Sequence, residues 1–143
     1  MGESMSPVRS CIVALALGAA SAAQAQNFLA TPGNGRVYPI NENVFEVVGN
    51  SGLGYDLWWC GASQYARRVL GAGWGAQVSI ARGLGPSQAT GRRSSVQFTL
   101  NPAALDVTVV HSTSPNALVV GDTKTVQTGN MSCDRLRFPQ RLR

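Results

Sequence analysis

The sequence contains three cysteines, Cys11, Cys60 and Cys133, and their positions constrain the fold more than any other feature. Cys11 lies in an N-terminal segment that we expect to be removed, which leaves one pair. In an oxidising compartment an even pair of cysteines forms a disulfide by default. A Cys60–Cys133 bond would close a loop of about 70 residues and stabilise the fold by roughly 4 kcal/mol. We therefore predict one disulfide that ties the middle of the chain to its end.

Residues 1–25 have the pattern of a secretory signal peptide. Arg9 supplies a short charged region, and an uninterrupted apolar run follows at residues 11–20. The sequence Ala-Gln-Ala at residues 23–25 places small residues at both positions that a signal peptidase inspects, so we expect cleavage before Gln26. The apolar run is too short for a transmembrane anchor, which needs roughly 20 residues. The sequence thus predicts an exported domain of residues 26–143, periplasmic or extracellular, and the short Ala-rich leader is typical of bacteria.

The composition is that of a globular protein, with 44% hydrophobic and 13% charged residues. The formal net charge is +5, and Lys124 is the only lysine, so arginine supplies nearly all of the positive charge. Arginine recognises phosphate and carboxylate groups, although a GC-rich genome is an alternative reason for its abundance. An anionic envelope component or an acidic protein is therefore the kind of partner that the charge favours. Nucleic acid is not expected, because no recognised binding module is present and the leader directs the protein out of the cytoplasm.

The stretch from Asp56 to Leu70 predicts an amphipathic helix, with Asp56 as N-cap and Gly71 as the residue that ends it. At about 100° per residue its apolar face carries five side chains, which are Trp58, Ala62, Tyr65, Ala66 and Val69. Cys60 falls on the opposite, polar side, together with Ser63, Gln64 and Arg67. Either a later segment crosses that side and is joined to it, or the thiol is exposed. The segment 131–138, which contains Cys133, is the one we expect to cross.

Alternation of apolar and polar residues predicts several short strands. They lie at 44–48, 76–82, 94–100 and 105–111, with a weaker final pair at 117–120 and 124–128. Pro39 argues against a central strand before Val44. Without a second helix to provide crossovers, the strands are expected to pair antiparallel. The predicted fold class is α+β, with a small antiparallel sheet packed against one long amphipathic helix and a single disulfide.

A catalytic thiol is the alternative to a structural disulfide. Cys60 lies in the first turn of the expected helix, where the helix dipole lowers the pKa of a thiol. His111 ends an expected strand and Asp122 follows, and these are the base and the orienting acid that a thiol nucleophile needs. The order Cys60, His111, Asp122 resembles the layout of transglutaminase-like cysteine hydrolases, and the resemblance implies thiol-dependent hydrolysis. A disulfide at Cys60 would exclude it.

Two basic segments are candidate binding regions. The Gly83–Arg93 connection, which carries Arg92 and Arg93, would suit an inhibitor or adaptor that contacts an anionic partner, and a solvated hairpin loop is the alternative. It lacks the glycine spacing and the following lysine of a phosphate-binding loop. The C-terminal tail would meet an anionic surface unless it is a frayed terminus. Its four arginines are Arg135, Arg137, Arg141 and Arg143.

Metal and cofactor sites are not predicted. One histidine and two distant cysteines do not have the spacing of a zinc site, and the acidic residues are not clustered. The three tryptophans, Trp58, Trp59 and Trp74, are expected in the core, although Trp59 and Trp74 lie where they could line a ligand groove. We therefore expect a non-catalytic domain with a binding role at the cell envelope, and the hydrolase and the adaptor remain alternatives.

Overall fold

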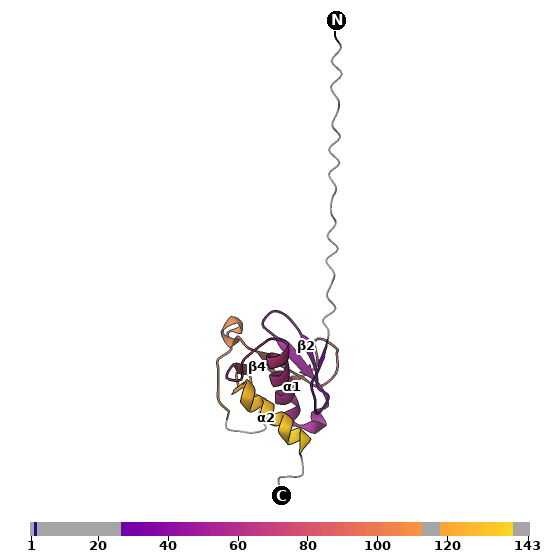
Figure 1. Cartoon of the computed structure of the whole chain (residues 1–143), viewed down its shortest axis with the longest axis vertical. Helices are drawn as coiled ribbons and strands as arrows, with labels where there is room; N and C mark the ends of the chain where they lie inside the picture. Colours follow the sequence, from indigo (N-terminus) through magenta and orange to yellow (C-terminus); the bar gives the residue numbers. More distant parts are fainter. Residues whose placement is uncertain (1, 3–26, 113–117, 139–143) are drawn as a thin grey trace.

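The computed structural model describes residues 2, 27–112 and 118–138 (Figure 1). The expected signal peptide, apart from Gly2, lies outside the described residues, and so do Arg141 and Arg143 of the tail. The helices and strands follow one another as β1 Phe28–Leu29, β2 Arg36–Pro39, β3 Phe45–Val48, η1 Ser51–Leu53, α1 Tyr55–Arg68, β4 Gln77–Gly85, β5 Ser95–Thr99, η2 Pro102–Leu105, β6 Thr123–Thr125 and α2 Val126–Arg137.

The strands form one antiparallel sheet in the order β1-β2-β3-β5-β4-β6, which confirms the predicted α+β class. Both edge strands are short, a feature that limits pairing between sheets of different molecules. Contrary to the expectation from Pro39, β2 lies inside the sheet. Pro39 is tolerated because β1 pairs only with Arg36 and Val37 of β2. The proline therefore has no β1 residue opposite it that would need a hydrogen bond from the N–H that proline lacks.

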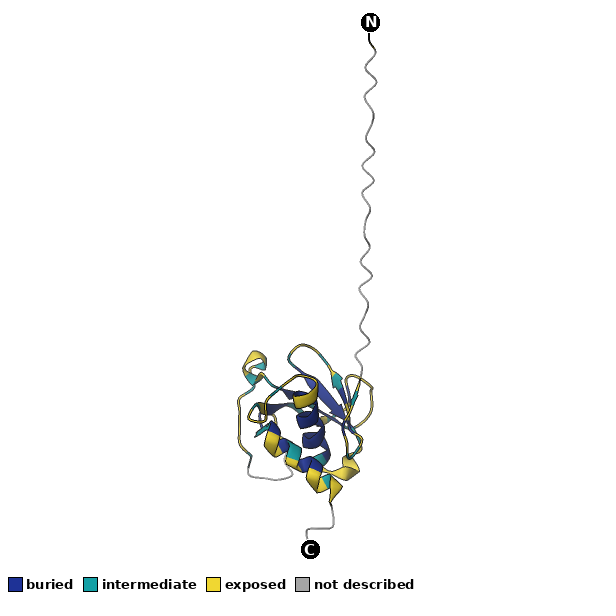
Figure 2. Cartoon of the chain, viewed as in Figure 1, coloured by how far each residue is buried: buried dark blue, intermediate teal, exposed yellow. Residues whose placement is uncertain are grey.

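The core lies between the sheet and α1, where alternate strand residues meet the helix (Figure 2). Phe98 of β5 packs edge-on against Trp59, with 5.2 Å between the ring centroids. Trp58 and Trp59 are buried, as predicted. Trp74 is 45% exposed, so the expectation that it packs in the core is wrong. It lies beyond the end of α1, in the connection to β4, and only part of its ring is covered, by Arg67 among others.

Helix α1 begins two residues earlier than expected, with Gly54 in place of Asp56 as its N-cap. Asp56 lies in the first turn and forms an ion pair with Arg135 at 2.9 Å. Gly71 follows the helix in the left-handed region, with φ +70°, as expected of a residue that turns the chain away. Val69 was expected on the apolar face but is half exposed, because the helix ends at Arg68.

A second helix, α2, was not predicted from the sequence. The strand expected at 124–128 ends at Thr125, whose hydroxyl accepts a hydrogen bond from the N–H of Thr128 at 3.1 Å and so caps the helix. Helix α2 crosses the polar side of α1 (Figure 1). There the Cys60–Cys133 disulfide joins the two helices, which confirms the predicted pairing. Helix α1 is therefore covered on both sides.

The strand expected at 105–111 does not form. A short 3-10 helix ends at Leu105, Asp106 adopts a left-handed conformation, and only Val110 makes a bridge, which is parallel, to Asp122. Val109 and Val110 are more than one-third exposed. Alternation alone does not produce a strand when neither face is covered and no neighbouring strand is available. None of the helices among the described residues has the length and apolar character needed to cross a bilayer.

Candidate functional site

The sheet face opposite α1 carries the polar side chains of the strands, because their apolar neighbours point into the core. Cross-strand pairing aligns the residues of this face, which include the apolar Val48, in two adjacent rows. One row consists of Arg36, Val48 and Ser95, and the other consists of Tyr38, Glu46, Gln97 and Arg82.

Glu46 lies at the centre of this face and is fully buried. Its carboxylate accepts hydrogen bonds from the N–H groups of Gln88 at 2.9 Å and Ala89 at 3.0 Å. The hydroxyls of Ser87, at 3.0 Å, and Ser95, at 2.8 Å, donate two more. A carboxylate is acceptor-only, so four donors satisfy its bonding capacity. Glu46 thus holds the connection between β4 and β5 against the sheet.

The same bonds keep Glu46 ionised. Desolvation by burial is the largest single influence on the pKa of Glu46, and it acts to raise it. The N–H groups of Ala89 and Gln88 and the hydroxyls of Ser95 and Ser87 act in the other direction and together prevail, so the pKa lies below the ordinary value of 4.5. Arg82 adds a counter-charge at 3.4 Å. Glu46 is therefore a charged anchor at neutral pH.

The connection that Glu46 holds is a closed turn. Because β4 extends to Gly85, the loop is shorter than the expected Gly83–Arg93 segment. Ser87 donates its N–H to the carbonyl of Arg92 at 2.7 Å, and Gly91 donates to the carbonyl of Ser87 at 2.9 Å. Gly91 adopts φ +72°, which favours glycine. The turn thereby fixes the backbone from which Arg92 projects.

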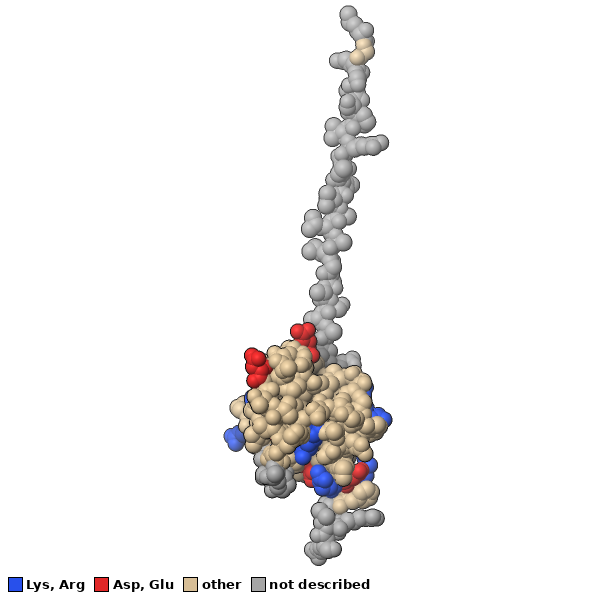
Figure 3. Space-filling view, turned by 90° about the vertical axis from the view of Figure 1, so that its left-hand side faces the viewer, with Lys and Arg blue, Asp and Glu red and all other residues tan. Residues whose placement is uncertain are grey.

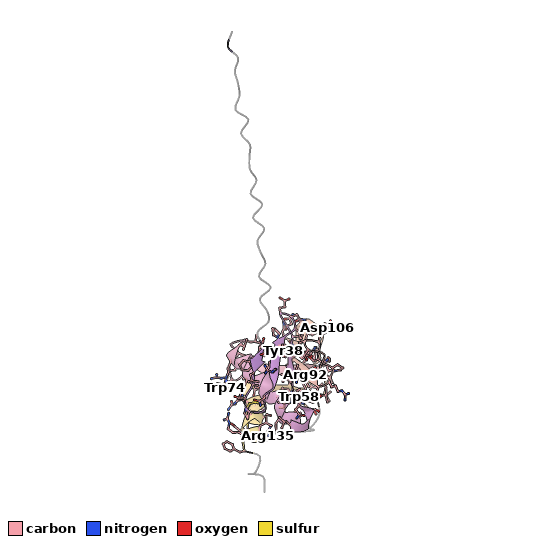
Figure 4. The ribbon with its side chains drawn as sticks, turned by 90° about the vertical axis from the view of Figure 1, so that its right-hand side faces the viewer. Tyr38, Trp58, Trp74, Arg92, Asp106 and Arg135 are labelled. Carbon is pink, nitrogen blue, oxygen red and sulfur yellow. A yellow bond between two sulfur atoms is a disulfide. The ribbon has the colours of Figure 1, made fainter. Side chains whose placement is uncertain are left out.

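Arg92 lines a hollow of about 660 Å³, which we call the arginine groove. Arg36 and Tyr38 of β2 border the same groove, and Val48 lies among its lining residues. Figure 4 labels Tyr38 and Arg92. The complete lining is Asn27, Gly33, Asn34, Arg36, Tyr38, Val48, Gly49, Asn50, Leu53 and Arg92. None of these described lining residues is acidic. The groove thus combines two guanidinium groups with the side-chain amides of three asparagines.

Such a lining suits an anionic, hydroxyl-rich ligand. Guanidinium groups bind carboxylate and phosphate in a fixed two-donor geometry, and amides donate to and accept from hydroxyls. The Nη1 group of Arg36 already donates to Asn27 Oδ1 at 3.3 Å, so two lining residues of the groove are in contact. A separate hollow of about 270 Å³ is lined mainly by apolar side chains and contains no arginine in its described lining.

The other arginines singled out in the sequence lie elsewhere. Arg93 is exposed and is not part of the described lining of the groove. Arg135 forms the ion pair with Asp56 and also donates to Ser132 Oγ at 2.9 Å. Arg137 lies on the last turn of α2, in a third hollow, which Trp74 also lines.

Of the three residues of the hydrolase alternative, His111 and Asp122 lie on neighbouring segments, but Cys60 has no free thiol. Cys60 is bonded to Cys133 between the helices and is 1% exposed. Asp122 lies beside the 110–112 segment and accepts hydrogen bonds from the N–H groups of Ser112 and Thr123, both at 3.1 Å. His111 is on that segment but exposed. A disulfide sulfur has no thiolate with which to attack a substrate.

Sequence reasoning missed Arg36, Tyr38 and Glu46. A signal for Glu46 was present, because it is the single charged residue within the apolar stretch Val44–Val48. A carboxylate in a strand that is buried on both faces needs donors from elsewhere in the chain. The identity of those donors, in the 86–95 segment, depends on the sheet order, which pattern alone does not reveal.

No group of three or more potential metal ligands is clustered within the described part of the chain. Comparisons with protein-family models, with curated proteins and with solved structures found no match to this chain. The geometry of the arginine groove is therefore the basis for a functional assignment.

Proposed function

We propose that the protein is a small, non-catalytic domain exported from a bacterial cell, which binds an anionic carbohydrate of the cell envelope in the arginine groove. The observation that carries the proposal is the convergence of Arg36 and Arg92 on one groove free of acidic residues in its described lining. These arginines come from separate segments, β2 and the loop after β4, so the fold itself creates the site.

Export is supported by the N-terminal pattern and by the buried disulfide. The leader has a charged start, an apolar run and small residues before Gln26. Disulfides such as Cys60–Cys133 persist in oxidising compartments and are rare in the cytosol. Both observations favour the periplasm or the cell exterior as the place where the protein works.

A carbohydrate with carboxylate or phosphate groups fits the groove chemically. The guanidinium groups of Arg36 and Arg92 are suited to the charged groups, and the amides of the three asparagines are suited to sugar hydroxyls. Because Glu46 fixes the turn that carries Arg92, little ordering of the loop is required on binding, and this reduces the entropic cost. The described lining contains no carboxylate, imidazole or thiol, and we therefore propose binding without turnover.

The test is calorimetric titration with oligogalacturonate, which carries carboxylates, and with a glycerol-phosphate oligomer, which carries phosphates. Methyl-esterified oligogalacturonate is the matched neutral ligand. We expect binding to an anionic ligand that weakens as salt is raised. Arg36→Ala and Arg92→Ala should each weaken it about tenfold or more, since a charge-assisted hydrogen bond contributes roughly 1.5–3 kcal/mol.

Arg93→Ala is the matched control, because it removes the same charge from the same loop outside the groove. Equal losses for Arg92→Ala and Arg93→Ala would show general attraction to a basic protein and would refute the groove. Equal affinity for the methyl ester would likewise refute an anionic ligand. The preferred oligomer distinguishes the carboxylate source from the phosphate source.

A further inference from the structure

Trp74 is the one tryptophan that the fold leaves at the surface. Its side chain is 45% exposed, whereas Trp58 is 1% and Trp59 0% exposed. The guanidinium carbon of Arg67, on the last turn of α1, lies over its ring at 4.0 Å from the centroid. Figure 4 shows Trp74 at the edge of the molecule, away from Tyr38 and Arg92. The arginine groove and the neighbourhood of Trp74 share no described lining residue.

Two hollows flank Trp74. The lining of one includes Arg67, Arg68 and Arg137, together with Cys133 of the disulfide. The other contains Met131, whose side chain is 53% exposed. Trp74 lines both hollows, so these side chains form one continuous surface. We call it the Trp74 surface, consisting of Arg67, Arg68, Trp74, Met131 and Arg137.

The Trp74 surface has a positive charge. Asp134 lines both hollows, but it is paired with Arg137 at 3.8 Å, which leaves the charges of Arg67 and Arg68 uncompensated there. Figure 3 shows most of the basic side chains in view over the part of the molecule nearer the C-terminal end, with acidic side chains among them, while the charged side chains at the opposite end are acidic. The charge is thus asymmetric, and it attracts an anionic surface to one end of the molecule.

The surface is also held rigidly. The carbonyl of Trp74 accepts a hydrogen bond from the N–H of Gln127 at 3.0 Å, and the carbonyl of Ala76 accepts one from Val126 at 2.8 Å. The first turn of α2 therefore fixes the segment that carries Trp74. Beneath it, the Cys60–Cys133 disulfide fixes α2 on α1. Both helices thus present their side chains to solvent in one defined arrangement.

We propose that the Trp74 surface docks the protein reversibly on an anionic lipid bilayer. Tryptophan has an apolar body with a polar N–H and concentrates at the level of lipid headgroups. Arg67 and Arg68 face the lipid phosphates, with Arg137 beside them paired to Asp134, and Met131 contacts the boundary of the acyl chains beside Trp74. Binding is peripheral, because the apolar area is small and charge attraction supplies much of the affinity. The arginine groove stays free, so a docked molecule is able to bind its carbohydrate.

The test uses the processed, oxidised protein and vesicles of phosphatidylcholine, with or without phosphatidylglycerol. Sedimentation measures how much protein binds, and an aqueous quencher measures the accessibility of tryptophan. Since Trp58 and Trp59 are buried, any change in quenching reports on Trp74. We expect binding to vesicles that contain phosphatidylglycerol, weaker binding at high salt, and protection of Trp74 from the quencher.

Matched variants separate the Trp74 surface from net charge. Arg67→Ala with Arg68→Ala should lower vesicle binding by about thirty-fold, from two uncompensated arginines at a membrane surface. Arg36→Ala with Arg92→Ala removes the same charge from the groove and should lower it far less. Trp74→Ala with Met131→Ser should also weaken binding at unchanged net charge. All six positions are at the surface, so far-ultraviolet circular dichroism should show an unchanged fold.

Equal losses for the two arginine pairs would overturn the proposal, because the attraction would then be to the whole molecule. Full access of the quencher to Trp74 on bound vesicles would overturn it too, and so would undiminished binding of the Trp74→Ala, Met131→Ser variant. Carbohydrate binding is measured separately with oligogalacturonate. Failure of the lipid experiment therefore leaves the proposal for the groove standing, and the reverse also holds.

Discussion

At the scale of single residues, Glu46 organises the face on which the proposed site lies. A buried carboxylate is costly unless its charge is compensated and its oxygens are fully hydrogen-bonded. Here the donors come from Ser87, Gln88, Ala89 and Ser95, all in or beside one turn. Replacement of the carboxylate would leave these donors without their acceptor, and the turn that carries Arg92 would loosen.

Glu46→Gln should lower the free energy of unfolding at neutral pH by about 2 kcal/mol or more, because an amide nitrogen replaces one acceptor oxygen in a buried site full of donors. The pKa of Glu46 is lower in the folded state, so its contribution is present above the ordinary value of 4.5 and is lost as the pH falls through the folded value. Stability should therefore fall on acidification below about 4.5 in the native protein and less steeply in the variant. Urea unfolding of the native protein and the variant at several pH values measures the loss of stability at neutral pH and its dependence on pH.

Glu42→Gln is the matched control for this experiment, because Glu42 is exposed on the connection between β2 and β3. It should change stability by less than about 0.5 kcal/mol. If the acid sensitivity of the Glu46→Gln variant equalled that of the native protein, another group would be responsible for it.

At the scale of elements, the crossing of α1 and α2 depends on a close approach at Gly129. A Cβ atom at this position would lie 1.9 Å from Ser63 Oγ and 3.5 Å from the carbonyl oxygen of Trp59. On the other side of α1, a Cβ atom at Gly61 would lie 2.8 Å from a methyl group of Val47. Glycine thus permits contact between α1 and each layer that covers it.

Gly129→Ala should lower the free energy of unfolding by about 2 kcal/mol, although alanine is the better helix former by roughly 1 kcal/mol. Adding Ser63→Ala removes the nearest clashing atom and should restore part of the loss, as a double-mutant cycle would show. Gly75→Ala, where no atom lies within 4 Å of the added carbon, is the control and should be near neutral. A stable Gly129→Ala protein with unchanged disulfide formation would contradict the close crossing.

At the scale of the whole molecule, the disulfide joins helices α1 and α2 through two cysteines that are 73 residues apart in the sequence. Gln64 extends this connection, because its amide donates to Cys133 Sγ at 3.2 Å and to the carbonyl of Thr31. The loop after β1, the helix α1 and the helix α2 are therefore held at one point. The roughly 4 kcal/mol that the disulfide contributes is a large share of the total stability of a small domain.

Protein purified without reductant should show no reactive thiol by intact mass before and after alkylation, because both cysteines are bonded and at most 2% exposed. The same mass should correspond to a chain that starts at Gln26. Replacing both cysteines by alanine should lower the free energy of unfolding by roughly 4 kcal/mol. Alkylation of Cys60 in the folded protein at neutral pH would contradict the structural role and would revive the thiol hydrolase with His111 and Asp122.

The sequence by itself determined the features that depend on local pattern and on counting. The two cysteines that remain without Cys11 predicted the Cys60–Cys133 disulfide. Hydrophobic periodicity predicted the helix that ends before Gly71 and the strands around Val47, Ile80 and Phe98. These features are encoded within a few residues, or in the number of cysteines, and need no knowledge of what packs against them.

The tertiary structure alone decided the rest. Helix α2 has weak local signals and forms where α1, the disulfide and the cap at Thr125 support it. The alternating 105–111 segment makes a single bridge, from Val110 to Asp122, and stays irregular. The arginine groove likewise exists because the sheet brings Arg36 near a turn held by Glu46. Contacts between residues far apart in sequence carry most of the free energy that selects these conformations, and local pattern contains no information about them.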